Sequence, residues 1–323
     1  MVVTITINPI VERRLYFDKF ESGKVNRTEK EKFRAGGKGI NVSRQLNNLG
    51  IKNTAVTFLG GDGGKLLRRT LKEEKIEFSP VQTGGETRQA WVAVDQSNKK
   101  VTSLFAPNSD ITQREADDFL DKSLKVINNA SVVVLAGSSP SETCDHIFPE
   151  IIKAAINEDK SVVADTYGKH LEACINAGPT ALHINRDEAV NSLGITLDSE
   201  EEYRNLLSGF YDRGIKLSFV TNGNKPFYSS KFDFHYKIGV PAIEEYDSTG
   251  SGDAFVAGIV YGMEKALVYD EFTNLAVKLG ALNATSEETC MVKINEIESF
   301  NSLADISPVG KKMKIIDDSP TIY

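Results

Sequence analysis

One short stretch combines residue types that could transfer a charged group. The sequence DSTGSGDAF, at residues 247–255, places a carboxylate, Asp253, directly after Gly250, Ser251 and Gly252, and a nearly all-apolar run follows. Such a run is typical of a buried helix, whose first N–H groups are unpaired and carry partial positive charge. Small residues before the helix let an anion approach the backbone. Two interpretations stay open: Asp253 offsets the helix dipole, or it is a base beside an anion hole for phosphoryl transfer.

A second glycine cluster lies near the N-terminus. The stretch AGGKGINVSR, at residues 35–44, surrounds Lys38 with three glycines and continues into a predicted helix that contains Asn41. The lysine could reach a phosphate, and the asparagine amide could bond sugar hydroxyls. The alternative is a plain loop with a surface lysine.

The common nucleotide-binding motifs are absent. GGDGGKLL, at residues 60–67, is superficially like a Walker A loop, but no Gly-Lys-Ser/Thr ending follows. The glycines of residues 35–42 are out of register for G-x-G-x-x-G. The chain is therefore neither a P-loop protein nor an evident dinucleotide binder.

Together, the two glycine-rich stretches resemble the signatures of the ribokinase-like, or PfkB, carbohydrate kinases. AGGKGINVS is similar to the N-terminal signature, and DSTGSGDAF is similar to the C-terminal signature Asp-Thr-x-Gly-Ala-Gly-Asp-x-Phe. They occur in the family's order, about 210 residues apart. INRDE, at residues 184–188, resembles the family's Asn-x-x-Glu motif, and Asn283 in GALNAT matches a residue near its adenine pocket. The resemblance spans nearly the whole chain.

The resemblance implies an ATP-dependent phosphotransferase that uses Mg²⁺. Asp253 would be the catalytic base, and the backbone N–H groups of Gly250, Ser251 and Gly252 would form the anion hole. The residues implied to bind the nucleotide are Asn185, Thr221, Gly223 and Asn283. Asn185 and Glu188 would also position Mg²⁺ through water, since oxygen ligands suit that ion. For INRDE alone, a solvated helix start remains the alternative.

Four N-terminal stretches narrow the resemblance to the sugar-phosphate branch, 1-phosphofructokinase and tagatose-6-phosphate kinase. They are TINPIVERR, KVNR, GGKGINVSRQLNNLG and ETRQAWVAV. The implied reaction is phosphorylation of a ketohexose phosphate, with a lean towards fructose 1-phosphate giving fructose 1,6-bisphosphate. Arginine forks bind phosphate bidentately, although solvated surface arginines are the alternative. The residues implied to bind the substrate are Glu12, Arg27, Gly37, Lys38, Asn41 and Arg88.

The sequence departs from the branch pattern at four places. Glu12 stands where the branch usually has Asp, and His183 replaces the usual Lys. Thr221-Asn222-Gly223 replaces Ser-Leu-Gly, and Ser251 replaces Ala. These departures keep two other functions open: a kinase of an unphosphorylated sugar or nucleoside, and a non-catalytic sugar-phosphate sensor.

The elements that must position these residues follow a βα pattern from residue 36 onward. The apolar runs are continuous rather than alternating, which predicts parallel strands covered on both faces. We therefore expect a doubly wound, mostly parallel α/β sheet with helices on both faces, and ligands beyond the carboxyl ends of its strands. Strands are predicted at 54–60, 131–137, 161–166, 181–185 and 217–223, and helices at 41–50, 64–76, 112–128, 144–157 and 200–213.

Two stretches break this rhythm and predict a small β-sheet lid. Residues 9–35 and 86–108 look like strands without helices, and the second contains a hairpin with a polar turn. The alternative is that they are edge strands of the main sheet. The expected division is a main domain of residues 1–8, 36–85 and 109–323 and a lid of 9–35 and 86–108. In the family such a lid often forms the dimer contact, which implies a homodimer.

Composition limits the partners. Of 323 residues, 40% are hydrophobic and 26% charged, which are ordinary globular values, and the net charge is −7. There is no long basic block, and KKMK at residues 311–314 reads as a solvated tail, which argues against nucleic acid or an anionic membrane as a partner. The start lacks a basic region typical of a signal peptide, and three scattered cysteines fit neither zinc spacing nor a disulfide framework. We expect a cytoplasmic protein.

Overall fold

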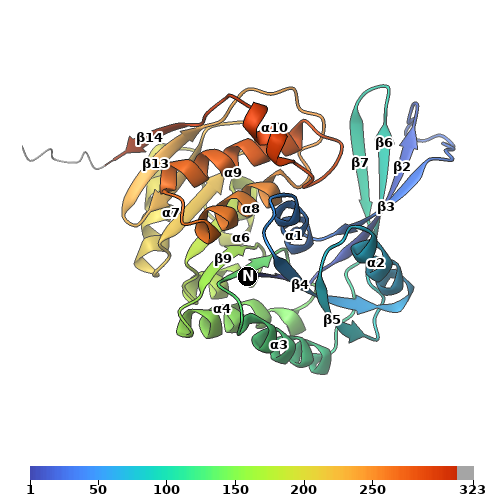
Figure 1. Cartoon of the computed structure of the whole chain (residues 1–323), viewed down its shortest axis with the longest axis horizontal. Coiled ribbons are helices and arrows are strands. Elements are labelled where there is room, and N and C mark those ends of the chain that lie inside the picture. The colour runs from blue at the N-terminus through green and yellow to red at the C-terminus, as the bar shows by residue number, and fades with distance from the viewer. Residues whose placement is uncertain (311–323) are drawn as a thin grey trace, which may run out of the picture.

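A large twisted sheet forms the centre of the molecule (Figure 1). In the computed structural model, which describes residues 1–310, ten strands join this sheet in the order β14-β13-β12-β11-β10-β9-β8-β1-β4-β5. The KKMK stretch lies outside the described residues. The strands are β1 (Val2–Thr6), β4 (Asn53–Gly60), β5 (Phe78–Thr83), β8 (Val132–Ala136), β9 (Ser161–Asp165), β10 (Ala181–Asn185), β11 (Leu217–Thr221), β12 (Phe227–Lys231), β13 (Phe234–Gly239) and β14 (Asp305–Val309).

Helices cover both faces of this sheet, as the continuous apolar strands predict. Every residue of β1 is buried, and alternate side chains enter different cores. Val3 and Ile5 pack with α3 and α4, whereas Val2 lies in the core with α1 and α8. The helices are α1 (Lys38–Asn48), α2 (Gly61–Glu73), α3 (Gln113–Ile127), α4 (Ile147–Asn157), α5 (Leu171–Asn176), α6 (Arg186–Leu193), α7 (Glu200–Asp212), α8 (Ser251–Glu264), α9 (Tyr269–Ala284) and α10 (Ile294–Ser299).

The mostly parallel order is confirmed, with one addition. The strands from β5 through β11 in the sheet order pair in parallel, and β12, β13 and β14 extend the sheet antiparallel. The sequence analysis did not predict these last three strands. Their sequences, such as FYSSK and FHYKIG, mix polar and aromatic residues, and they lie at the sheet's edge where continuous apolar runs are not required.

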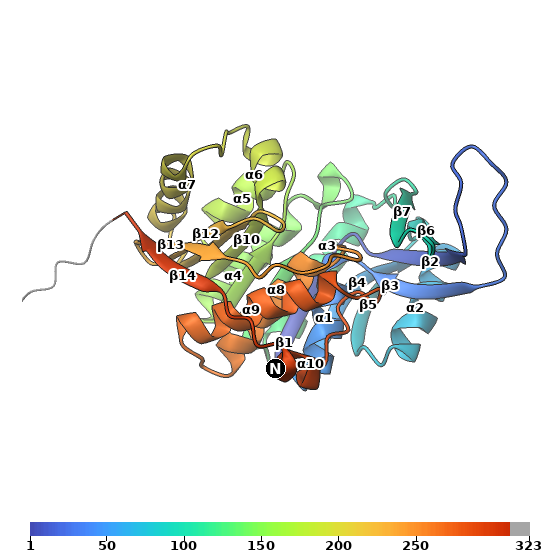
Figure 2. The same ribbon diagram turned by 90° about the horizontal axis from the view of Figure 1, so that it is seen from above.

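Four further strands form a separate sheet, which we call the lid (Figures 1 and 2). Their order within the described chain is β3-β2-β6-β7, from β2 (Ile10–Phe17), β3 (Glu31–Gly36), β6 (Gln89–Asp95) and β7 (Lys100–Phe105). The alternative that these strands are edges of the main sheet is therefore wrong. β6 and β7 pair antiparallel, as the predicted hairpin requires.

Two features of the chain bear on its environment. The three cysteines, Cys144, Cys174 and Cys290, are buried and free. No helix between residues 1 and 310 combines the length and apolar character that a bilayer crossing requires.

Candidate active site

The polar residues of the candidate site begin at the carboxyl ends of parallel strands. Asp165 ends β9, Asn185 ends β10, and Thr221 ends β11. The strand register places His183 opposite Asp165 and Asn185 opposite Thr221. This edge of a parallel sheet is where ligands bind in open α/β folds.

The predicted anion-hole loop leads into α8 at this edge. Gly250 has φ +80°, in the left-handed region, and a Cβ there would overlap the Thr289 methyl group. Only glycine meets both conditions without strain. Asp253 follows in the first turn of α8 and is 5% exposed. We call residues 247–253 the catalytic turn, after the role that the sequence analysis predicts for them.

The N-terminal glycine stretch meets the catalytic turn. Gly37 has φ +114°, and a Cβ there would lie 2.7 Å from Thr6 Cγ2, so α1 begins at Lys38, three residues earlier than predicted. Because α1 packs against α8, Asn41 Nδ2 donates a hydrogen bond of 2.7 Å to Asp253 Oδ2. Arg44 Nη1 donates to Asn41 Oδ1 at 2.6 Å and fixes the orientation of that amide. Two motifs about 210 residues apart in sequence therefore form one site.

A cation, Lys38, lies close enough to Asp253 to influence its charge. Lys38 Nζ is 2.8 Å from Glu188 Oε1 and 3.2 Å from Asp165 Oδ1. His183 Nδ1 is 3.0 Å from the same oxygen of Asp165, and His183 Nε2 is 3.1 Å from Thr221 Oγ1. Lys38 was predicted to bind the substrate, and the structure brings it to the strand ends that were predicted to bind the nucleotide.

Asp165 is the functional candidate that the sequence analysis missed most clearly. The side chain is fully buried, and within residues 1–310 its Oδ2 has no hydrogen-bond partner. A buried carboxylate oxygen without a donor is costly unless a ligand or ion completes it. Its position as the last residue of a buried strand was a signal that the sequence analysis did not use.

The two buried carboxylates, Asp253 and Asp165, have opposite pKa shifts. Burial raises the pKa of Asp253 to about 7, and the neighbouring charge of Asp165 adds to the rise, against the opposing effect of Lys38 and the Asn41 hydrogen bond. Burial also acts to raise the pKa of Asp165, but Lys38 and His183 outweigh it and hold that pKa near 2. Burial alone would lower the pKa of Lys38, yet the carboxylates of Asp165, Glu188 and Asp253 raise it well above its usual range. The site thus holds a permanent ion pair beside a carboxylate that titrates near neutrality.

A second cluster of polar side chains surrounds Arg88. Arg88 Nη2 donates to the Asn8 carbonyl at 3.3 Å, and Nη1 donates to Asn108 Oδ1 at 3.2 Å. Asn8 Nδ2 donates to Ser138 Oγ at 3.2 Å. In the described part of the chain, Arg88 Nε and Asn8 Oδ1 lack partners, so a donor and an acceptor remain for a ligand. Asn8, Asn108 and Ser138 were also missed, although Asn8 and Ser138 follow the ends of β1 and β8.

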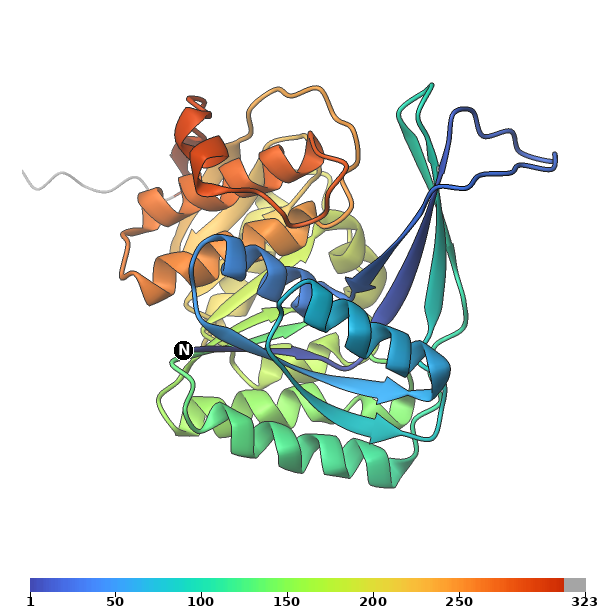
Figure 3. The same cartoon turned by 45° about the vertical axis from the view of Figure 1, so that its right-hand side comes forward.

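The other predicted residues have different surroundings. Asn283 is buried and donates to the Thr249 carbonyl at 2.9 Å and to Ser251 Oγ at 3.1 Å, so it supports the catalytic turn. Gly223 has φ +58° and open space beside it. Glu12, on β2, lies next to Gly36. Arg27 is exposed in the loop of residues 18–30, at the end of the lid away from Gly36 (Figure 3). The structure therefore brings Arg88, but not Arg27, to the strand ends.

Asn185 and Glu188 form a reciprocal cap at the start of α6. Glu188 N donates to Asn185 Oδ1 at 2.8 Å, and Asn185 N donates to Glu188 Oε2 at 3.2 Å. Across residues 1–310, no group of three or more His, Cys, Asp or Glu side chains is arranged to hold a metal ion.

Comparisons with known proteins identify the family. A family model described as pfkB family carbohydrate kinase matches residues 2–295. The chain belongs to this family. It is 27% identical over 303 residues to a tagatose-6-phosphate kinase of Staphylococcus epidermidis, covering 93% of this chain and 97% of that one. It is 28% identical over 292 residues to a 1-phosphofructokinase of Borreliella burgdorferi, covering 90% of this chain and 94% of that one.

A solved structure has the same architecture. The Thermotoga maritima protein described as "Possible 1-phosphofructokinase" superposes with a TM-score of 0.87 at 26% identity, covering 96% of this chain and all of that one. The predicted α/β fold and family are confirmed. As a pfkB family carbohydrate kinase, the chain is a phosphotransferase with ATP as its co-substrate.

Proposed function

We propose that the chain phosphorylates a ketohexose phosphate, with fructose 1-phosphate as the first candidate and tagatose 6-phosphate as the second. The observation that carries this proposal is the contact between Asn41 and Asp253, which unites both glycine-rich stretches around one buried carboxylate. Relatives named for both activities support the substrate class.

In the proposed reaction, Asp253 accepts the proton of the sugar hydroxyl as that oxygen attacks the γ-phosphorus of ATP. The new O–P bond forms while the bond from the γ-phosphorus to the β–γ bridging oxygen breaks, and ADP leaves. The amides of Gly250, Ser251 and Gly252 stabilise the charge on the phosphoryl oxygens, which is where fixed dipoles act most strongly. Lys38 adds a cation whose position is fixed by Asp165 and Glu188.

Both substrates, the sugar phosphate and ATP, have candidate binding residues in this site. Arg88, together with Asn8, offers a donor and an acceptor to the acceptor sugar and its phosphate. Thr221 and Gly223 are proposed to line the nucleotide, and Asn283 to hold the turn beside it. Glu188 and Asn185 would hold Mg²⁺ through water, and the orphaned Asp165 oxygen fits the same role. The ion would supply charge neutralisation at the phosphates.

The lid and the quaternary structure remain part of the proposal. The lid exposes Trp91, Leu104 and Phe105, at 40%, 60% and 65% of their surfaces. Trp91 and Leu104 are register partners on β6 and β7, so they form one apolar patch. We propose that this patch joins two chains in a dimer, that residues 9–35 and 86–108 form the lid domain beside the main domain, and that the protein works in the cytoplasm.

A coupled assay of ADP release tests the activity. Fructose 1-phosphate, tagatose 6-phosphate and fructose 6-phosphate are compared with unphosphorylated fructose and a nucleoside. Turnover with one phosphosugar supports the proposal, and no turnover with any of the three contradicts it. Asp253→Asn should lower kcat by about 10²–10⁴-fold because the base is lost, with ATP binding retained in calorimetry. Sugar-phosphate binding without ATP turnover by the unmodified chain would instead indicate a sensor.

One observation favours a second candidate, a kinase of an unphosphorylated sugar or nucleoside. Of the two arginines predicted to hold a phosphate, only Arg88 lies at the strand ends. If the true substrate carries no phosphate, replacing Arg27 and Arg88 by Ala leaves turnover nearly unchanged. A phosphosugar kinase would lose affinity for its substrate in the same double variant.

A further inference from the structure

Two buried arginines of the lid contact the segments that hold the catalytic turn. We propose that Arg14 and Arg34 are positioning residues that couple closure of the lid to the geometry of the anion hole. This inference rests on the proposed function, since the turn matters as an anion hole only in a phosphotransferase of this kind. The contacts themselves are independent of which sugar is the substrate.

The first contact reaches the beginning of the turn. Arg14, on β2, is 1% exposed, and its Nη2 lies 3.4 Å from Asp247 Oδ2. The other oxygen of Asp247 accepts a hydrogen bond of 3.0 Å from Thr249 N. Arg14 is thus joined through one carboxylate to the backbone just before Gly250.

The second contact is with the segment of residues 288–290, which packs beside Gly250 in the middle of the catalytic turn. Arg34, on β3, is 3% exposed, donates from Nη1 to Thr289 Oγ1 at 2.8 Å, and forms an ion pair with Glu288. The Thr289 methyl group occupies the space beside Gly250, and Cys290 Sγ is 3.3 Å from the Gly250 carbonyl. Movement of residues 288–290 would therefore change the support of Gly250.

Both arginines lie on one face of the lid. In the β2–β3 register, Arg14 is opposite Lys32 and Glu12 is opposite Arg34, and alternate residues of a strand share a face. Lys32 adds an exposed ion pair with Glu288 at 2.6 Å. The lid therefore presents a cationic inner face to acids on two main-domain segments, around residues 247 and 288.

The burial of these cations ties them to a closed lid. A buried charge is tolerated only with a partner, and removing one partner leaves a costly uncompensated charge. If the lid moves away, Arg14 and Arg34 become hydrated while Asp247 and Glu288 lose their counter-ions together. Closure and support of the catalytic turn are thus parts of one transition, as expected when a lid completes a catalytic site.

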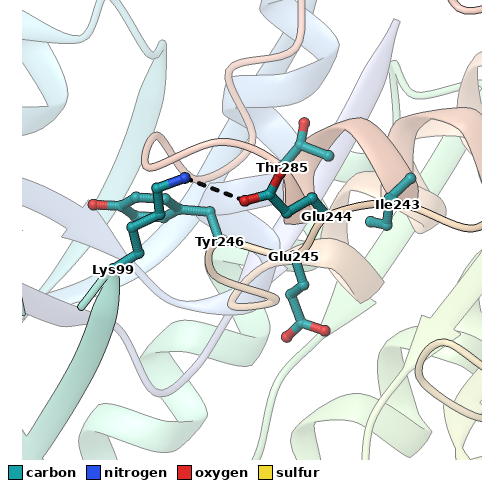
Figure 4. Close-up of a pocket in the computed structure, with 6 residues that line it drawn as sticks. All are labelled: Lys99, Ile243, Glu244, Glu245, Tyr246 and Thr285. Carbon is teal, nitrogen blue, oxygen red and sulfur yellow. Dashed lines mark hydrogen bonds and ion pairs between the residues drawn. The ribbon is translucent and has the colours of Figure 1, made fainter.

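Some buried polar atoms at the contact between the lid and the main domain lack hydrogen-bond partners, which favours reversible opening of the lid. Among the described residues, Arg14 Nε and Glu12 Oε2 have no hydrogen-bond partner. A further contact, between Lys99 Nζ at the tip of the β6–β7 hairpin and Glu244 Oε1 at 3.2 Å, crosses a pocket of about 310 Å³ lined also by Tyr246 and Thr285 (Figure 4). Both of its charges are exposed, so it contributes little to the stability of the closed state. The two buried arginines therefore dominate the coupling.

The test compares Arg14→Gln and Arg34→Gln with Arg13→Gln. Arg13 is a matched control because it is next to Arg14 on β2 but pairs within the lid, with Glu31 at 3.2 Å, and lies over the Phe33 ring. Hydrogen–deuterium exchange of residues 247–253 is measured without substrate, and kcat and KM are measured with the best sugar. We expect both inner-face variants to exchange faster at the turn and to lose about 10–100-fold in kcat, with KM changed less, since small misplacements of catalytic groups are costly. Arg13→Gln should match the unmodified protein in both measurements.

Two further variants keep the inference falsifiable if a glutamine variant fails to fold. Glu288→Gln removes the half-exposed partner of Arg34, and Arg14→Lys keeps the charge of Arg14 while losing its fork. The first should speed exchange at the turn, and the second should restore part of the protection that Arg14→Gln loses. The exchanged pair Arg34→Glu with Glu288→Arg should exchange more slowly at the turn than Arg34→Glu alone.

Folded inner-face variants with unchanged exchange at the turn and unchanged kcat would overturn the coupling. That result is distinct from failure of the proposed function, which is absence of phosphosugar turnover by the unmodified chain. The exchange measurement needs no substrate, so it stands whichever sugar is used.

Discussion

The floor of the site and the lid above it are held in different ways. The floor is joined by short hydrogen bonds between buried groups, such as Asn41 to Asp253 at 2.7 Å, and by backbone turns that admit only glycine. The lid is joined to the main domain by side-chain ion pairs, among them Arg14 with Asp247 at 3.4 Å and Lys99 with Glu244 at 3.2 Å. The floor is therefore held by packing and short hydrogen bonds, whereas the lid is held by ion pairs whose charges can instead be hydrated. Changes to the floor should therefore affect chemistry most, and changes to the lid's outer face should affect it least.

The largest effect is expected at Gly250. Gly250→Ala combines a left-handed φ with overlap against Thr289, so the turn must shift. We expect kcat to fall on the order of 100-fold or more, as when an anion-hole donor is displaced, and stability to fall by about 1–3 kcal/mol. Gly214→Ala is the control, because it has a similar φ of +88° but open space beside it, and Gly214 belongs to no proposed binding site. Steady-state kinetics and thermal unfolding of both variants measure the difference, and equal kcat losses would contradict a role for close packing at Gly250.

The next effect concerns Arg88, which directly precedes lid strand β6 and lies beside the strand ends of the main sheet. Arg88→Ala removes the guanidinium that faces Asn8 and Asn108 and should raise KM for a phosphosugar by about 10–100-fold, the range of a lost charge-assisted hydrogen bond. The kcat should change less, because Arg88 is not near Asp253 among the contacts described. Arg27→Ala, at the far end of the lid, provides the comparison. If Arg27→Ala has the larger effect on KM, the phosphate is bound by the loop of residues 18–30 and not beside the strand ends.

A smaller effect is expected in the pH profile. The raised pKa of Asp253, about 7, means that the base is protonated at lower pH, so kcat/KM should rise with pH up to about 7 and then level off. Asp165→Asn removes a neighbouring negative charge that raises this pKa, so the limb of the residual activity should move to lower pH. A limb that stays in place or moves to higher pH would show that Asp165 does not set the charge balance at Asp253.

The smallest effect on chemistry is expected at the outer face of the lid. Trp91→Lys places a charge in the apolar patch with Leu104, so we expect the proposed dimer to dissociate. The chain should still fold, and kcat should change by less than about threefold, because Trp91 pairs in register with Arg13 and so lies on the face of the lid opposite Arg14. Analytical ultracentrifugation measures the mass. A variant that keeps the mass of the unmodified chain would remove this patch from the dimer contact. A large loss of kcat would show that the outer face also orders the site.

The accuracy of the sequence analysis followed the type of contact. The two glycine stretches were predicted to share one site, and the hydrogen bond between Asn41 and Asp253 brings them together. Such stretches can be recognised locally because backbone conformation and close approach impose residue types. Strands such as 181–185 were placed correctly because burial on both faces produces continuous apolar runs. The edge strands β12 to β14 were missed because exposed or mixed strands have no comparable pattern. Asp165 was missed because a single acidic residue at the end of a strand has no sequence feature that distinguishes it from acidic residues without a functional role.

The sequence by itself determined the family, the α/β class and the two motifs, because these depend on local geometry and on periodic burial. Only the tertiary structure decided which charges meet: Lys38 with Asp165 and Glu188, Arg14 with Asp247, and Arg34 with Glu288. These ion pairs join residues up to 254 positions apart and need only opposite charge within reach, so no spacing in the chain specifies them. Their partners are chosen when the sheet, the helices and the lid come together.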